Sequence, residues 1–271
     1  MLLRDVEYAR PESVAEAVRI LSEHPNARAL AGGQTLLNVM KARAASPDVL
    51  VDLADLDELR TIARTSDGGL EIGAMVTCSE LVDSGDVVEA RPLLAGVTQT
   101  IADVQVRNRG TIGGNVCSND PTNHLPPVMV AMGAEMTIVG PAGERTVPAD
   151  EFFVGVYMTA VGPGELLTRI AVSPRGRGDG FAAVTIGRDG TCIVNAAASV
   201  ADGDARLVLG CVSAVPVLLG TAPEAEAAAR AVREAQLDPP SDVHASADYR
   251  RHLAQVLAAR AVRQAAQGGG E

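Results

Sequence analysis

LAGGQTLL, residues 30–37, places two adjacent glycines between a short apolar run and a segment whose apolar residues have helical spacing. The run from Ala27 to Ala31 predicts a strand, and the segment from Thr35 to Ala42 predicts a helix. VLVDL at 49–53 predicts a second, buried strand. The first fifty residues therefore predict a β-α-β unit in which the glycines form the turn between strand and helix.

Glycines at this point of a β-α-β unit often bind phosphate, because backbone N–H groups converge there on an anion at a helix N-terminus. The junction nevertheless lacks both common phosphate fingerprints, G-x-G-x-x-G and G-x-x-x-x-G-K-[ST]. Taken alone, the pair favours a tight turn that requires positive φ and binds nothing.

A second glycine-rich segment, TIGGN at 111–115, follows about eighty residues later. It lies within residues 105–127, which are dense in Gly, Asn, Asp and Pro and predict an ordered loop. Two such loops from distant parts of the chain are suited to hold the two phosphates of a dinucleotide from opposite sides. The pairing indicates FAD, with two unrelated tight turns as the alternative on spacing alone.

The remaining segments predict a mixture of helices and strands. A polar, glycine-rich stretch at 173–180 predicts a linker before a change of pattern. The other predicted elements are helices at 11–23, 78–84, 87–102, 128–132, 223–236 and 246–266, hairpins at 61–65 with 70–73 and at 134–139 with 145–147, and strands at 165–172, 181–186, 192–201 and 205–213.

Composition excludes several classes of partner. The formal charge of −11 would repel a phosphate backbone, so we expect no nucleic acid. The N-terminus has no apolar signal region and no run of eighteen apolar residues occurs, so we expect a cytoplasmic chain without a membrane span. Four scattered cysteines, without C-x-x-C or zinc spacing, predict free thiols and no metal site in this chain.

Several motifs together resemble one family. AGGQTLLNVMK, PDVLVDL, LEIGAMVT, NRGTIGGN with a following DP and LPP, and GELLTRI occur in this order over nearly the whole chain. The sequence resembles the medium, FAD-binding subunit of the molybdenum hydroxylases, the xanthine dehydrogenase and carbon monoxide dehydrogenase family. The resemblance implies an α+β fold: a two-subdomain FAD-binding domain of the vanillyl-alcohol-oxidase (PCMH) type, followed by a C-terminal three-stranded antiparallel sheet with helices. We expect the domains at 1–175, with subdomains of about 1–55 and 56–175, and at 176–271.

The resemblance also implies cofactor-binding residues. In the family an apolar residue stands at the position of Ile101 and a Leu lies beside the isoalloxazine at the position of Leu166, although core packing is the alternative for both. Asp120 and His124 correspond to the part of the second loop that contacts the adenosine half of FAD. The pyrophosphate is held by the two glycine loops, which correspond here to Ala31, Gly32, Gly33, Gln34, Thr35, Leu36, Thr111, Ile112, Gly113, Gly114 and Asn115.

Three positions depart from the family pattern. His124 stands where an Asp is frequent, and Thr185 and Cys192 stand where many relatives have a Lys and an aromatic residue near the flavin. These departures leave the contacts to adenosine and to the ring open. For Cys192, a small packing residue is favoured over a redox thiol.

The function implied by the resemblance is electron transfer within a heteromeric complex. A large subunit with a molybdenum pterin oxidises the substrate, a small subunit with two [2Fe–2S] clusters relays electrons, and FAD in this chain passes them to an external acceptor, in a dimer of heterotrimers. No catalytic acid, base or nucleophile is expected here. The alternatives are a free-standing flavin reductase or oxidase and an assembly scaffold with a decayed FAD site. The substrate and the acceptor, whether NAD, quinone or oxygen, stay open.

Overall fold

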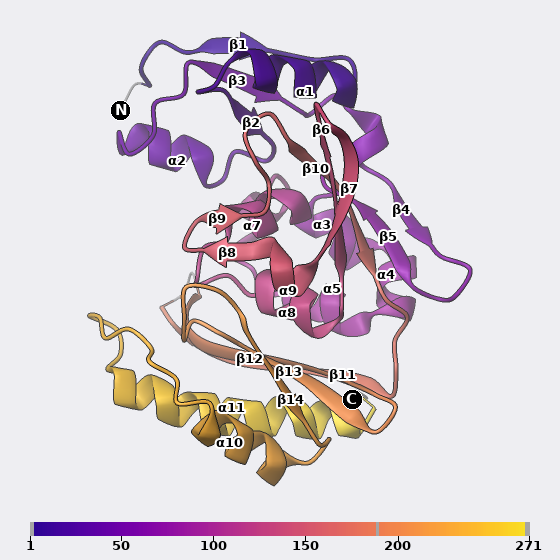
Figure 1. Ribbon diagram of the computed structural model, residues 1–271, viewed down its shortest axis with the longest axis vertical. Coiled ribbons are helices and arrows are strands. Elements are labelled where there is room, and N and C mark those ends of the chain that lie inside the picture. Colours follow the sequence, from indigo (N-terminus) through magenta and orange to yellow (C-terminus); the bar gives the residue numbers. More distant parts are fainter. Residues whose placement is uncertain (1–2, 188–189, 269–271) are drawn as a thin grey trace.

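The computed structural model describes residues 3–187 and 190–268, and its elements form three tiers along the long axis (Figure 1). Each tier has its own sheet, and the sheets follow one another along the chain. The arrangement is a mixture of helices with parallel and antiparallel strands, as expected for the α+β class. Within the described residues no helix has the length and apolar character needed to cross a membrane.

The first tier contains the β-α-β unit around the first glycine loop. Its three-stranded sheet has the order β1-β3-β2, with both neighbours paired in parallel. The helix α1 begins after Ser13, whose side chain accepts a hydrogen bond from the Glu16 amide. The elements are β1 (Glu7–Ala9), α1 (Val14–Glu23), β2 (Arg28–Leu30), α2 (Leu36–Lys41), β3 (Val49–Asp52) and a 3-10 turn (Asp57–Leu59). The predicted β-α-β unit is confirmed, while β1 was not predicted.

The second tier is built on a five-stranded antiparallel sheet with the order β4-β5-β10-β6-β7. Both predicted hairpins are present, and the central strand is the last to occur in the sequence. The strands are β4 (Ile62–Arg64), β5 (Leu70–Gly73), β6 (Glu135–Gly140), β7 (Gly143–Pro148) and β10 (Leu166–Val172), with a small separate hairpin of β8 (Phe153–Gly155) and β9 (Met158–Thr159) after the short helix α9 (Ala149–Phe152).

Six further helices lie between β5 and β6, and two predictions there were wrong. The single helix expected at 87–102 is two helices, because Pro92 begins a new one after Arg91. The loop expected at 105–127 contains three helices of four to seven residues, too short to show helical periodicity. The helices are α3 (Cys78–Asp83), α4 (Gly85–Ala90), α5 (Pro92–Gln99), α6 (Val104–Arg107), α7 (Ile112–Ser118) and α8 (Leu125–Ala131).

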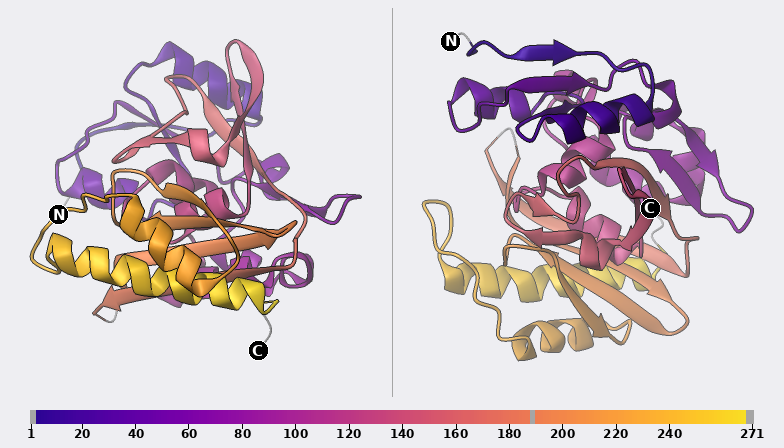
Figure 2. Two further views of the ribbon diagram at one scale, coloured as in Figure 1. Left: turned by 60° about the horizontal axis from the view of Figure 1, so that its bottom comes forward. Right: turned by 45° about the horizontal axis from the view of Figure 1, so that its top comes forward.

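The third tier is a four-stranded antiparallel sheet whose outer face is covered by two helices (Figure 2). The three expected strands are present, but a fourth, β14, extends the meander beyond the predicted three. It follows a turn-rich segment and is only half-buried, which weakens its alternating pattern. The elements are β11 (Gly178–Ile186), β12 (Thr191–Ala201), β13 (Asp204–Gly210), β14 (Val217–Thr221), α10 (Ala225–Glu234) and α11 (Ala247–Ala266).

The second and third tiers share one apolar core. Every residue of α8 is buried, and its cluster extends to Ala197 and Val208 of the third sheet. The Arg91 guanidinium, 2 % exposed, donates at 2.9 and 3.0 Å to both carboxylate oxygens of Asp179. Asp179 lies in β11, which begins inside the stretch predicted as a linker. The 173–180 segment is therefore partly a strand fixed to the second tier.

Candidate functional site

The two glycine loops lie directly against each other. A Cβ atom on Gly32 would stand 2.0 Å from the carbonyl oxygen of Arg109 and 2.8 Å from the Cα of Gly110. No side chain fits in that space, so the contact between the two backbones requires glycine at position 32. Segments separated by about eighty residues thus form one structure, as their pairing in the sequence predicted.

The loops also face each other at Gly114. A Cβ atom on Gly114 would lie 2.9 Å from the Thr111 hydroxyl oxygen and 3.7 Å from the Cβ of Ala31. The second loop is held in place from behind, because the amides of Ile112 and Gly113 donate to the carbonyls of Val76 and Ala74 at 2.9 Å. Any side chain at position 114 therefore grows into the space between the loops.

The first loop has a row of backbone donors without protein acceptors. Within residues 3–187 and 190–268, the amides of Gly32, Gly33, Gln34 and Thr35 donate no hydrogen bond. Gly33 has a φ of +70°, a left-handed conformation that suits glycine. Thr35 precedes α2, and its exposed side chain makes no capping bond. These amides stand at the N-terminal end of α2, where an anion is favoured.

The second loop contributes differently. Thr111 caps α7 by accepting a hydrogen bond from the Gly114 amide at 3.0 Å. Most backbone N–H groups of the second loop therefore already donate to acceptors within the protein. The side-chain oxygen of Asn115 is buried and has no hydrogen-bond partner among the described residues. A buried polar atom without a partner costs about 1–3 kcal/mol, and a ligand between the loops would remove that cost. The cradle and this atom fit a dinucleotide phosphate.

Arg109 is a candidate that the sequence analysis did not select. Its carbonyl contacts Gly32, and its side chain is exposed and has no ion-pair or hydrogen-bond partner in the part of the chain that the structure describes. Because the Arg109 backbone forms part of the cradle, its guanidinium is a candidate counter-charge for a bound phosphate. The sequence could have indicated Arg109 as a site residue, because it lies within the motif NRGTIGGN directly before Gly110.

The predicted residues around the flavin and adenosine belong to different parts of the fold. Leu166 is 5 % exposed and belongs to the apolar cluster of the first tier, which also contacts Ala31. Ile101 is half-buried against the second-tier core. Asp120 is engaged by the Thr122 amide at 2.9 Å, and the hydroxyl of Tyr157 donates to its other oxygen at 3.2 Å.

The structure places His124 against the third sheet. The residue is 7 % exposed, its ring packs edge-to-face on Phe181 with centroids 5.2 Å apart, and its Nδ1 lies 3.3 Å from the Nδ2 of Asn195. The other two departures from the family pattern, Thr185 and Cys192, are direct cross-strand partners. All three positions therefore belong to one region between α8 and the β11–β12 hairpin.

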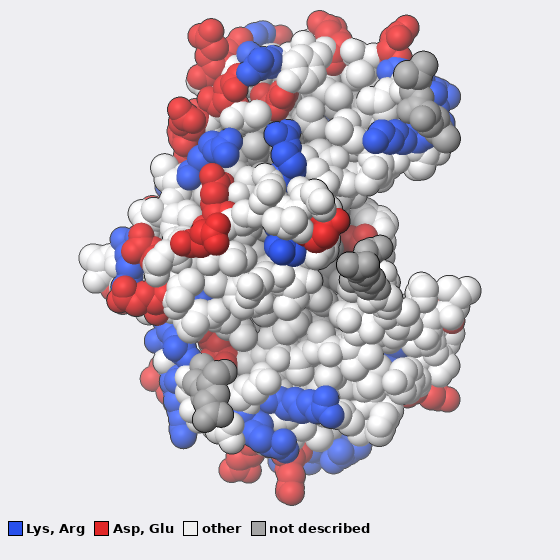
Figure 3. Space-filling model, turned by 180° about the vertical axis from the view of Figure 1, so that it is seen from behind, with Lys and Arg blue, Asp and Glu red and all other residues white. Residues whose placement is uncertain are grey.

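Charges on the surface do not mark a nucleic-acid site. Seen from behind, acidic side chains crowd the upper tier and basic ones gather over the lower tier, with a hollow between the two lobes on the side that carries α2 (Figure 3). No group of three or more His, Cys, Asp or Glu residues within the described ranges is arranged to hold a metal ion.

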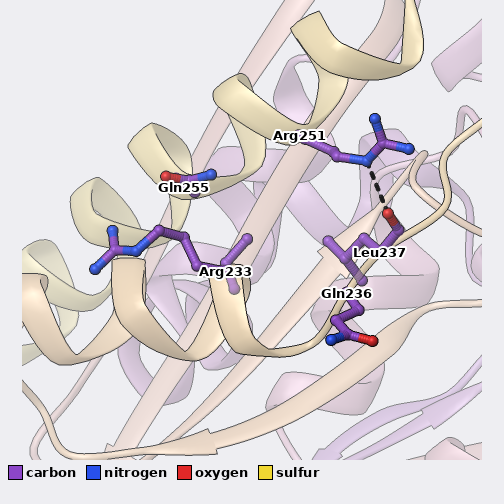
Figure 4. A pocket seen from close by; sticks show the side chains of 6 residues that line it. Arg233, Gln236, Leu237, Arg251 and Gln255 are labelled. Atoms are coloured by element: carbon purple, nitrogen blue, oxygen red, sulfur yellow. Dashed lines mark hydrogen bonds between the residues drawn. The ribbon is translucent and has the colours of Figure 1, made fainter.

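A separate cavity of about 310 Å³ lies on the outer side of the third tier, far from both glycine loops (Figure 4). Arg251 in this cavity donates to the Leu237 carbonyl at 2.9 Å and forms ion pairs with Asp238 and Asp248. Its positive charge is therefore balanced by carboxylates of the same chain. The cavity is lined by Val232, Arg233, Gln236, Leu237, Arg251 and Gln255. None of them is a predicted site residue.

Comparison with known proteins agrees with this arrangement. Residues 4–174 match the family described as FAD binding domain in molybdopterin dehydrogenase, and residues 181–265 match the CO dehydrogenase flavoprotein C-terminal domain. The carbon monoxide dehydrogenase medium chain of Afipia carboxidovorans is 38 % identical, with 98 % of each chain covered. The nicotine 6-hydroxylase medium subunit of Paenarthrobacter nicotinovorans is 32 % identical, covering 98 % of this chain and 99 % of the relative.

A solved structure gives the same result in three dimensions. The crystal structure of quinoline 2-oxidoreductase from Pseudomonas putida 86 matches with a TM-score of 0.91 and 34 % identity, covering 99 % of each chain. The expected fold and cofactor class are confirmed by these matches. The chain belongs to the FAD-binding medium-subunit family of the molybdenum hydroxylases and is an oxidoreductase subunit of that family.

Proposed function

We propose that this chain binds FAD between its two glycine loops and transfers electrons within a heteromeric molybdenum hydroxylase. The observation that carries the proposal is the contact of Gly32 with Arg109, which brings the free amides of residues 32–35 and the orphaned oxygen of Asn115 to one cradle. When bound, FAD would supply the redox chemistry of the electron transfer.

Each residue of the cradle has a distinct proposed role. The amides of Gly32 to Thr35 bind one phosphate, and the Thr35 hydroxyl adds a donor. Gly114 leaves room for the diphosphate, Asn115 contacts it through the side chain, and Arg109 balances its charge. Ile101 and Leu166 form apolar support for the ring, and Asp120 and His124 belong to the adenosine side.

The proposed partners are a large subunit with a molybdenum pterin and a small subunit with two [2Fe–2S] clusters, as a dimer of heterotrimers. The substrate specificity of the complex is set by the large subunit. A cytoplasmic location is supported by the cysteines, since all four are free thiols. We propose a division of the chain into an FAD-binding domain at 1–175, with subdomains of about 1–55 and 56–175, and a C-terminal domain at 176–271.

Purification of the native complex through a tag on this chain tests the proposal. We expect one FAD per chain, together with iron and molybdenum in the co-purifying subunits. Adding substrate under anaerobic conditions should bleach the flavin absorbance. A flavin-containing chain without iron or molybdenum would instead indicate a free-standing reductase or oxidase, and a colourless chain that takes up no FAD on titration would overturn the assignment of the cradle.

A further inference from the structure

A cluster of two thiols, an amide and an imidazole is enclosed between α8 and the third sheet. The Nδ2 of the fully buried Asn195 lies 3.4 Å from the sulfur of Cys192 and 3.8 Å from that of Cys211. The same nitrogen lies 3.3 Å from the Nδ1 of His124. The thiols are 2 % and 6 % exposed. One amide group therefore holds both sulfurs near each other and near a basic ring.

A β-bulge creates this cluster. Val184 pairs with Val194, whereas the next residue, Thr185, pairs with Cys192, so Ile193 is an additional residue in β12. A shift of one residue turns the following side chains to the opposite face. Cys192 consequently shares a face with Asn195, which regular alternation would forbid. Cys211 reaches the same place because it leaves β13 with a φ of +66°.

The surroundings make the two thiols unequal. The hydrogen bond with the Cys211 thiol, followed by the hydrogen bond with His124, lowers the pKa of Cys192 below its ordinary value, against the opposing effect of burial. The pKa of Cys211 is raised, first by its hydrogen bond with Cys192 and then by burial. A thiolate beside a protonated thiol is the starting arrangement for oxidation of a dithiol.

Access is provided for a very small molecule. A cavity of about 10 Å³ is lined by Cys211 and Asp120 but not by Cys192, so a small oxidant would approach the cluster from the side of the Cys211 sulfur. This is roughly the room that one water-sized molecule requires. Bulky disulfides do not fit there, which leaves small oxidants.

From this geometry we infer that Cys192 and Cys211 are a redox-active dithiol, which hydrogen peroxide converts to a disulfide. The Cys192 thiolate attacks one peroxide oxygen, the O–O bond breaks, and the departing hydroxide takes a proton to form water. The resulting sulfenic acid on Cys192 is attacked by the Cys211 sulfur, which forms the S–S bond and releases a second water. Two thiols and one peroxide thus give one disulfide and two waters.

Peptide mass mapping of the full chain tests the inference. The protein is treated with hydrogen peroxide, alkylated and digested. We expect a Cys192–Cys211 linked peptide that disappears after dithiothreitol. Cys78 is the internal control, because it is 3 % exposed and burial raises its pKa to about 11. We expect Cys192 to react at least about tenfold faster than Cys78.

Two variants separate the steps. In Cys211→Ser, the sulfenic acid on Cys192 has no partner and should be trapped when the oxidised protein is unfolded in the presence of dimedone. In the matched variant Cys78→Ser, the linked peptide should form as in the unchanged protein. The inference is overturned if Cys192 and Cys78 are oxidised at the same rate, or if Cys192 passes to a sulfinic acid while Cys211 remains a thiol. Even if Cys211→Ser does not fold, peptide mapping of the wild-type protein shows whether the disulfide between Cys192 and Cys211 forms.

Discussion

Gly114 and Gly96 are both helical glycines, yet a methyl group added to each meets different surroundings. At Gly96, in α5, no atom lies within 4 Å of the added carbon. At Gly114 that carbon enters the space between the loops, near Thr111 and Ala31. The structure therefore explains why a glycine is needed at position 114, where a side chain would enter the cradle, but gives no such reason at position 96.

Gly114→Ala should raise the dissociation constant of FAD about tenfold or more, because overfilling a close contact costs about 1–3 kcal/mol. Its unfolding midpoint should fall only slightly, because the contact of the new methyl with the Thr111 hydroxyl is partly offset by the preference of alanine for the helix. Gly96→Ala is the matched control and should keep FAD affinity. Fluorescence titration with FAD and thermal unfolding measure the two effects. Equal FAD affinity in both variants would contradict the cradle.

Arg109→Met should weaken FAD binding about fivefold to tenfold by removing the proposed counter-charge while keeping the length of the side chain. The loss should shrink as salt is added, because the side chain is exposed. Arg230→Met, an exposed arginine on α10, is the control and should leave binding unchanged. Titration at low and high ionic strength checks this. A variant that binds as tightly as the control removes Arg109 from the site.

Between elements, the pair of Arg91 and Asp179 connects the end of α4 to the start of β11. The guanidinium also donates to the carbonyls of Ser173 and Met132 at 3.1 and 3.2 Å. Each of its three nitrogen atoms therefore makes a hydrogen bond. Burial lowers the pKa of Arg91, which means that the charged form depends on these partners. The pair fixes the orientation of the third sheet relative to the second tier.

Arg91→Met should lower the free energy of unfolding by about 3 kcal/mol, because it leaves the buried Asp179 with only Arg175, at 3.9 Å, as a counter-charge. Replacing both residues with apolar ones should cost less than the sum of the single changes. Arg251→Met, whose partners Asp238 and Asp248 are 96 % and 94 % exposed, should cost less than about 1 kcal/mol. Urea unfolding provides the values. Similar losses in Arg91→Met and Arg251→Met would contradict a structural role for the buried pair.

The elements that the sequence predicted well are those with strong local patterns. The β-α-β unit around Gly32 and Gly33, both hairpins and the long helix α11 follow directly from periodicity and turn residues. Helices α6 and α7 were missed, and only residues 128–132 of the α8 region were predicted as helix, because a helix of one or two turns has no period to detect. The contact of Asn195 with His124 and Cys192 was unpredictable, since it depends on packing across tiers and on the bulge at Ile193.

At the scale of the whole molecule, the second tier depends on the third. Val128 and Met129 of α8 are fully buried in a cluster that includes Ala197 and Val208. Arg206 of β13 also donates to the Val130 carbonyl at 3.1 Å. Without the third tier, this apolar surface and the Arg91 charge would meet water.

A fragment of residues 1–175 should therefore be insoluble or lack cooperative unfolding, whereas the full chain should unfold in a single transition that fluorescence and circular dichroism report together. The buried α8 surface is the physical reason, because an exposed apolar face of this kind promotes aggregation. Expression of both lengths, followed by size-exclusion chromatography and urea unfolding, checks the expectation. A monomeric fragment with its own sharp transition would show that the domains are independent.

The central place of β10 in its sheet has a consequence for synthesis on the ribosome. The hairpins β4–β5 and β6–β7 emerge first, and they have no common partner until residues 166–172 are made. At about 5–20 residues per second, the first hairpin waits roughly five to twenty seconds for the strand that joins the two. During that interval the facing edges of β5 and β6 are exposed, so the nascent chain is most vulnerable to wrong pairing before β10 appears, and chaperone binding is most useful then.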